Sequence, residues 1–150
     1  MVLFDGFVLE DGEVPRNHVG AACLDVQQRA FGLIPHAALG TLFLTRRRVL
    51  FMGDGYRPLL EVRVEHLTAG GLHRPGLLTL VPLLVLLYRA GDAGHRARFR
   101  LTDERNGQSD EAAIGEWLDA LSAVMRGEGL RLGELPAGPS TLRRWLFGGA

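Results

Sequence analysis

The stretch GTLFLTRRRVLF, residues 40–51, decides how the chain folds. Its two apolar runs, residues 40–45 and 48–52, are typical of strands, and only Arg46 and Arg47 need lie between them. Such short spacing predicts a β-hairpin that turns at these two arginines. Because a third arginine, Arg48, follows directly, the turn also raises the question of a binding site for an anion.

Three segments after the hairpin extend the β-rich pattern. Residues 60–66, LEVRVEH, alternate apolar and charged side chains and predict one strand whose buried face includes His66. Residues 83–89 are apolar almost throughout, which predicts a strand buried on both faces. After a turn at residues 90–94, residues 95–101 alternate again, and the outward residues are Arg96, Arg98 and Arg100.

The hydrophobic period becomes helical after Ser109, which is a suitable helix cap. The apolar positions that share one helical face are Ile114, Trp117, Leu118, Leu121, Val124 and Met125. Gly127 and Gly129 predict the end of the helix. We expect this single amphipathic helix to cover the core made by the strands before it, among them one at residues 19–31.

Composition indicates an ordinary folded domain. The chain has 150 residues, of which 47% are hydrophobic and 23% charged, and this length suits one domain with a core. Seventeen basic residues balance seventeen acidic ones, so any anion site is local. Cys23 is the only cysteine, the N-terminus does not resemble a signal peptide, and no apolar run reaches about 20 residues, so we expect a cytoplasmic protein.

Residues 40–51 resemble the signature hairpin of GRAM domains, which belong to the pleckstrin-homology-like superfold, and in particular the stand-alone bacterial type. The later segments follow in the same order: LEVRVEH, the apolar connection GLLTLVP, the strand LLVLLYR, a Gly-Asp turn, a strand that contains RFR and a helix that contains EWLDAL. The resemblance covers roughly residues 14–128, although residues 19–34 do not align clearly.

The resemblance implies a mainly β domain over residues 1–132. Its expected fold is a bent seven-stranded sheet, or partly open barrel, that is capped by one amphipathic C-terminal helix. Residues 133–150 lie outside the family pattern and predict a Pro/Gly linker followed by a short amphipathic tail.

The hairpin arginines are the first candidate site. Guanidinium groups bind phosphate in a bidentate manner, so Arg46, Arg47 and Arg48 are candidates for binding a lipid phosphate or another anion. The resemblance implies membrane phosphoinositide binding for some relatives. The alternative is structural, with Arg46 and Arg47 as solvated turn residues and Arg48 as the start of the second strand.

The second candidate site is the stretch GGLHRPGLLTLVP, residues 70–82. As a loop between strands, it would expose an apolar patch that suits a membrane interface or a protein partner. The apolar contact candidates are Leu77, Leu78, Leu80 and Val81, together with Trp145 in the tail, and the anion candidates are His73 and Arg74. The alternative is a longer buried strand or a turn that fills the core.

Signals for catalysis and for nucleic-acid binding are poor. The five histidines lack the spacing of metal ligands, no serine lies in a nucleophile elbow, and Cys23 has no histidine near it in sequence. The outward arginine row lacks exposed aromatic residues, because Phe99 is predicted to point inward, and Glu61 and Glu65 would temper its charge if the sheet brought them near. We therefore predict no catalytic residue, metal, cofactor or nucleic-acid partner.

The leading hypothesis is a non-enzymatic binding module, peripheral at the membrane. Its partner would be a phospholipid headgroup or a protein supplied in trans, as the length of the chain leads us to expect. The alternatives are a homo-oligomeric assembly module with no lipid role and a small-molecule carrier.

Overall fold

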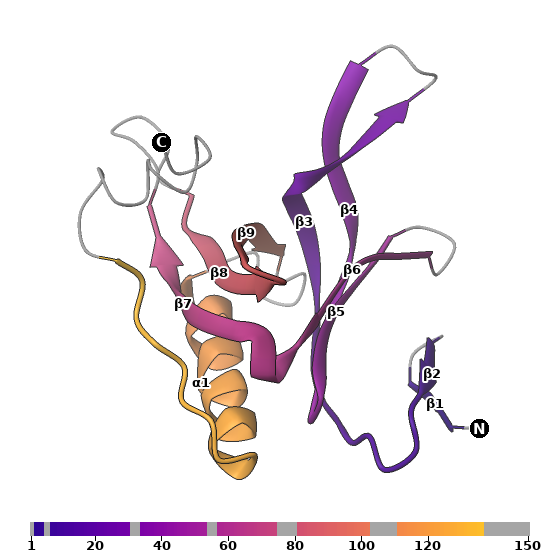
Figure 1. Cartoon of the computed structure of the whole chain (residues 1–150). Helices are drawn as coiled ribbons and strands as arrows, with labels where there is room; N and C mark the ends of the chain where they lie inside the picture. Colours follow the sequence, from indigo (N-terminus) through magenta and orange to yellow (C-terminus); the bar gives the residue numbers. More distant parts are fainter. Residues whose placement is uncertain are drawn as a thin grey trace.

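The computed structural model describes residues 2–4, 7–30, 34–53, 57–74, 81–102 and 111–136. These residues form nine strands and one α-helix, which Figure 1 shows along the chain. The strands are β1 (Val2–Phe4), β2 (Phe7–Leu9), β3 (Pro15–Ala30), β4 (Ile34–Thr45), β5 (Arg48–Gly53), β6 (Arg57–Arg63), β7 (Leu67–His73), β8 (Leu83–Ala90) and β9 (Ala93–Thr102). Helix α1 covers Glu111–Gly127, and a short 3-10 helix, Val64–His66, joins β6 to β7.

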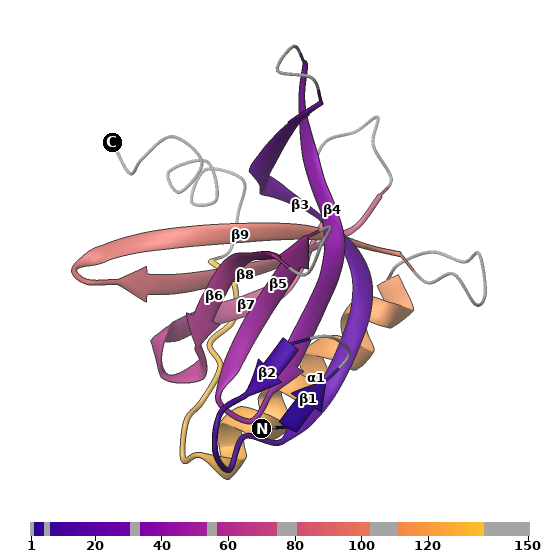
Figure 2. The same ribbon diagram turned by 90° about the vertical axis from the view of Figure 1, so that its right-hand side faces the viewer.

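Seven strands form one antiparallel sheet in the order β6-β5-β4-β3-β9-β8-β7, and β1 pairs with β2 in a separate small hairpin. The sheet is strongly bent, because β8 and β9 run across the direction of β3 and β4 (Figure 2). Helix α1 follows the last strand and contacts β7, β8, β9 and β3. The expected mainly β fold, with a bent seven-stranded sheet and one C-terminal helix, is therefore confirmed.

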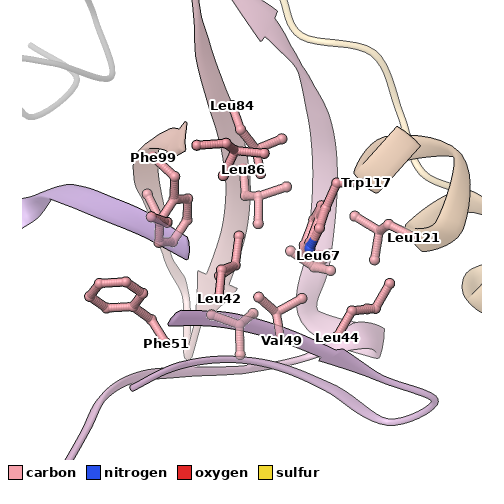
Figure 3. Close-up of a cluster of buried hydrophobic side chains, with 14 of the residues drawn as sticks. Leu42, Leu44, Val49, Phe51, Leu67, Leu84, Leu86, Phe99, Trp117 and Leu121 are labelled. Carbon is pink, nitrogen blue, oxygen red and sulfur yellow. The ribbon is translucent and has the colours of Figure 1, made fainter. Parts of the chain in front are cut away.

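The main hydrophobic core lies between the two halves of the sheet and the helix (Figure 3). Phe51 of β5 and Phe99 of β9 are both fully buried, and their rings pack at a tilt with centroids 5.7 Å apart. From α1, Trp117 and Leu121 point into the same core. Each of these side chains contributes about 1.5–3 kcal/mol through burial, so the helix is held mainly by this apolar contact.

Most of the predicted elements are confirmed. In the hairpin, β4 and β5 pair with Leu44 opposite Val49, and the chain turns at Arg46 and Arg47. The side chains predicted to face inward from β9 are buried: Ala97, Phe99 and Leu101. Strand β8 is buried on both faces over its first five residues. Helix α1 ends at Gly127 as predicted, whereas the predicted cap Ser109 lies outside the described residues.

The prediction of one strand over residues 60–66 is wrong. Strand β6 ends at Arg63, and Val64–His66 form the 3-10 helix, so that His66 is exposed rather than buried. Strands β6 and β7 are the two edges of the sheet, and the bend brings these edges close enough for one short helix to join them. The N–H of Val64 donates to the carbonyl of Arg47, which fixes this corner against the hairpin turn.

Residues after α1 return to the sheet. Gly133 forms a parallel bridge with Ala69 of β7: its N–H donates to the carbonyl of Thr68, and its own carbonyl accepts from the N–H of Gly70. Leu135 then packs on the outer face of β7 and β8, where it meets Gly71. The outer edge of β7 is therefore partly covered by the chain itself.

The segment before β3 covers the outer face of the hairpin. Leu9 of β2 packs on Phe43, Leu50 and Met52, and for this reason β5 is buried on both faces although it lies near the edge of the sheet. Because Arg48 begins this buried strand, its charge needs a partner inside the fold.

Arg48 finds that partner in Glu13. Its Nε lies 2.8 Å from Glu13 Oε2 and its Nη2 3.0 Å from Glu13 Oε1, and the Glu13 side chain has no exposed surface. Arg48 also donates to the carbonyl of Val8 and to Glu61 of β6. One guanidinium thus joins the N-terminal segment, β5 and β6, and Arg48 begins the second strand of the hairpin, as the structural alternative predicts.

The Glu13 carboxylate is also bound by the hairpin itself. Thr45 Oγ1 donates to it at 2.6 Å, and the backbone N–H of Glu10 donates at 2.9 Å. Burial by itself raises the pKa of Glu13, but the hydrogen bonds from Arg48, Thr45 and Glu10 outweigh it, so the pKa is lowered. The folded state therefore holds the Glu13 side chain as a charged carboxylate.

Replacing Gly40 by alanine tests the closest approach in the hairpin. A Cβ atom at Gly40 would lie 1.9 Å from the backbone carbonyl oxygen of Met52, so the strands would have to separate. We expect Gly40→Ala to lower the free energy of unfolding by more than about 2 kcal/mol in urea titrations. Gly115→Ala is the control, because Gly115 is exposed in α1 with open space around it, and it should raise stability by about 0.5–1 kcal/mol.

Replacing Glu13 by glutamine tests the buried ion pair. We expect Glu13→Gln to lower the free energy of unfolding by about 2–4 kcal/mol near neutral pH, because Arg48 would keep its buried charge without a carboxylate. Since the folded pKa of Glu13 lies below its usual value of 4.5, the advantage of the wild type is fully present above that pH and decreases as the pH falls through the folded pKa.

The control for the ion-pair test is Glu128→Gln, which removes an exposed partner of Arg46 and should cost less than about 1 kcal/mol. Equal losses in the two variants, or a loss in Glu13→Gln that persists unchanged in acid, would contradict the role given to Glu13.

Candidate functional site

The structure separates the three hairpin arginines by environment. Arg46 and Arg47 are exposed at the turn between β4 and β5, whereas Arg48 is buried in its ion pair with Glu13. Arg46 Nε lies 2.6 Å from Glu128 Oε1, just beyond the C-terminus of α1. Arg47 Nη1 lies 3.5 Å from Glu10 Oε2. Each of the arginines therefore faces a carboxylate of the same chain.

The arginines and glutamates in the ion pairs around the turn are equal in number. Glu10 also binds Arg63 of β6, at 3.0 Å, and the hydrogen bond from Arg63 is the main reason why the pKa of Glu10 is lowered. The ion pairs around the turn join four arginines to four glutamates: Arg46, Arg47, Arg48 and Arg63 with Glu10, Glu13, Glu61 and Glu128. These ion pairs leave no surplus of positive charge around the turn.

His73 and Arg74 lie at the opposite end of the helix. His73 is the last residue of β7 and pairs with Leu83, so it belongs to the sheet rather than to the loop in which it was expected. Arg74 follows and pairs with Glu111, the first residue of α1. At the other end of α1, Arg46 pairs with Glu128, the residue just after the helix. A helix of 17 residues is about 25 Å long, so these two groups of basic residues form separate surfaces.

Little of the predicted apolar patch falls within the described residues. Leu77, Leu78, Leu80 and Trp145 lie outside them. Val81 is half-buried just before β8, and His73 is half-buried at the end of β7. Burial lowers the pKa of His73, and the nearby charge of Arg98 lowers it further, so this histidine lies in a region of positive potential.

A charged cluster that the sequence did not predict lies on the other half of the sheet. Arg96 and Arg98 point outward from β9 as expected, but both bind Asp25 of β3. Glu61 and Glu65 do not temper them, because Glu61 lies on β6, several strands away, and pairs with Arg48. Only the alternation of β9 could be read from the sequence, since Asp25 lies more than 70 residues away.

Tyr88 and His95 flank this charged cluster at the β8–β9 hairpin. Their rings stack with centroids 5.5 Å apart. Burial raises the pKa of Tyr88, and the charge of Asp25 raises it further. The two aromatic rings thus border the part of β9 that carries the two arginines.

The described residues show no sign of a metal site or of a membrane-spanning helix. They contain no group of three or more His, Cys, Asp or Glu side chains that could hold a metal ion. In the same part of the chain, no helix has the length and apolar character needed to cross a bilayer.

Comparison with protein-family models and with curated proteins finds no match to the chain. Among solved structures, the chain is similar to the hSac2 domain from the human phosphoinositide phosphatase Sac2, with a TM-score of 0.65 and 14% identity over 87% of this chain and 80% of that one. It is also similar to the Vps36 N-terminal PH domain, with a TM-score of 0.52 and 17% identity over 79% of this chain and 86% of that one. These similarities agree with the strand order and the C-terminal helix, and they show that the fold is pleckstrin-homology-like.

Proposed function

We propose that this chain is a non-enzymatic binding module, of the GRAM type within the pleckstrin-homology-like superfold, that docks peripherally on membranes with anionic lipid headgroups. The observation that supports this most strongly is the fold itself: a bent seven-stranded sheet with a C-terminal helix, similar to the Vps36 N-terminal PH domain and to a domain of a phosphoinositide phosphatase. A shared fold does not fix a ligand, so the choice of surface rests on the charges of this chain.

The surface that we propose for lipid is the end of the domain with His73 and Arg74. The ion pair of Arg74 with Glu111 is about half exposed on both sides, and exposed pairs of this kind contribute little, so Arg74 can exchange its partner for a lipid phosphate. The apolar residues predicted for membrane contact, Leu77, Leu78, Leu80 and Val81, follow it directly in the chain.

The hairpin turn is the weaker choice for lipid. Arg46 and Arg47 face glutamates, and the ion pairs around them balance in charge. Because the turn and Arg74 lie at opposite ends of α1, one flat membrane would not contact both.

Assembly through the sheet edges is less well supported than lipid binding. Gly133 already pairs with the edge strand β7. The other edge, β6, begins with Arg57 and Pro58 and carries Glu61 and Arg63, and proline and charged side chains discourage pairing between sheet edges.

Co-sedimentation with vesicles tests the proposal. We expect the protein to pellet with phosphatidylcholine vesicles that contain phosphatidylserine, to remain in the supernatant with phosphatidylcholine alone, and to be released by added salt. Arg74→Ala should weaken binding about fivefold, since one basic residue near an anionic surface contributes about 1 kcal/mol. The double variant Arg46→Ala, Arg47→Ala is the matched control and should pellet like the wild type.

Two outcomes would contradict the proposal. Failure to pellet with either vesicle would exclude binding to this lipid surface, and a mass that rises with concentration in sedimentation equilibrium would then favour the assembly alternative. Loss of binding in the hairpin variant, with Arg74→Ala unaffected, would move the lipid site to the turn.

A further inference from the structure

The two strands at the centre of the sheet separate beside Asp25. Strand β3 pairs with β9 only from Gly20 to Cys23, and its pairing with β4 shifts register between Cys23 and Gln27. The backbone N–H of Arg98 therefore has no strand partner on this side. It donates to Asp25 Oδ2 at 2.7 Å, so a carboxylate takes the place of a backbone carbonyl.

The guanidinium groups of Arg96 and Arg98 both bind the carboxylate of Asp25. Arg96 Nη2 lies 3.1 Å from Asp25 Oδ1, and Arg98 donates to Asp25 through both Nε and Nη2. The side chains of Arg96, Arg98 and Asp25 are only 12%, 26% and 20% exposed, so water screens their charges incompletely. Here two positive charges meet one negative charge.

The carboxylate does not satisfy all the donors that surround it. Arg96 Nη1 is buried and has no hydrogen-bond partner. A buried donor on a charged group is costly when it lacks an acceptor, and a carboxylate has two oxygens, both already used by Arg96 and Arg98. The cluster thus has one more cation, and at least one more donor, than Asp25 can serve.

Within the part of the chain that the structure describes, the other titratable groups near the cluster do not remove this surplus. His73 of β7, whose pKa is lowered by burial and by the charge of Arg98, is neutral or positive and so adds no negative charge. Tyr88 of β8 has a raised pKa and stays neutral, and it stacks on His95. Asp25 is therefore the carboxylate that the described residues bring to Arg96 and Arg98.

We propose that Arg96, Arg98 and the Arg98 backbone N–H form a binding site for a phosphate group, which the carboxylate of Asp25 fills in the absence of ligand. A phosphate monoester has more acceptor oxygens and up to twice the charge of a carboxylate, and planar guanidinium groups bind it in a bidentate manner. Phosphate that displaces Asp25 would match the two arginines in charge and offer an acceptor to Arg96 Nη1. This site does not depend on the proposed membrane surface, because soluble phosphate can fill it.

Titration with inorganic phosphate, followed by the NMR signals of the Arg98 backbone N–H and of the Arg96 and Arg98 Nε–H groups, tests the site. Sodium chloride at equal ionic strength provides the reference. We expect saturable shifts of these signals with phosphate in the wild type, and binding about tenfold tighter in Asp25→Asn, because the variant loses the competing charge but keeps the shape of the side chain. Arg98→Gln should abolish the shifts of the two signals that it retains, the backbone N–H of residue 98 and Arg96 Nε–H, whereas Arg57→Gln, which changes an exposed arginine on β6, should leave all three signals shifting.

Several outcomes would overturn the proposal: shifts no larger with phosphate than with chloride, phosphate binding that is unchanged or weaker in folded Asp25→Asn, or equal losses in Arg98→Gln and Arg57→Gln. If Asp25→Asn does not fold, the wild type and Arg98→Gln decide alone, by the presence of saturable shifts in the first and their absence in the second.

Co-sedimentation with vesicles distinguishes the two possible sources of the phosphate group, a lipid headgroup and a free phosphate compound. If the ligand is a lipid headgroup, Asp25→Asn should also pellet more strongly than the wild type with vesicles that contain phosphatidylinositol phosphate. If it is a free phosphate compound, only the soluble titration should respond. Phosphate binding without any vesicle binding would leave this site standing while the proposed membrane function fails.

Discussion

The buried ion pair between Glu13 and Arg48 is the interaction on which the rest of the structure depends. A strand buried on both faces begins with an arginine, and such a charge is tolerated only when a well-placed partner and further hydrogen bonds accompany it. Glu13 supplies the partner, and Thr45 Oγ1 and the Glu10 backbone N–H donate further hydrogen bonds to its carboxylate. Glu61 of the edge strand β6 forms a second ion pair with Arg48. The N-terminal segment, the hairpin and β6 are held in one arrangement by these contacts.

This arrangement determines where positive charge is available. The arginines of the hairpin turn face glutamates, so the most basic stretch of the sequence forms a balanced end of the domain. The bend of the sheet places the cations that outnumber their partners elsewhere, on β9 beside Asp25, and it sets Arg74 at the far end of α1. A local run of arginines in a sequence is therefore a poor guide to a surplus of charge in the folded protein.

The sequence predicts the elements whose signals are local. The β4–β5 hairpin, the alternation of β9 and the apolar stripe of α1 follow from the spacing of neighbouring residues. The end of β6 at Arg63 could not be predicted, because the bend of the whole sheet imposes it. The partners of Arg48 and Arg98 could not be predicted either, since Glu13 lies 35 positions and Asp25 73 positions from them in the chain.

The most direct test of this account is a double-mutant cycle with Glu13→Gln, Arg48→Gln and the two changes together, measured as free energies of unfolding in urea. If Arg48 serves the fold through Glu13, the two substitutions are strongly coupled: the double variant should be more stable than the sum of the single losses predicts, by about 2 kcal/mol or more. Additive losses would contradict the account, because they would mean that Arg48 and Glu13 act independently and that Arg48 is available for another partner.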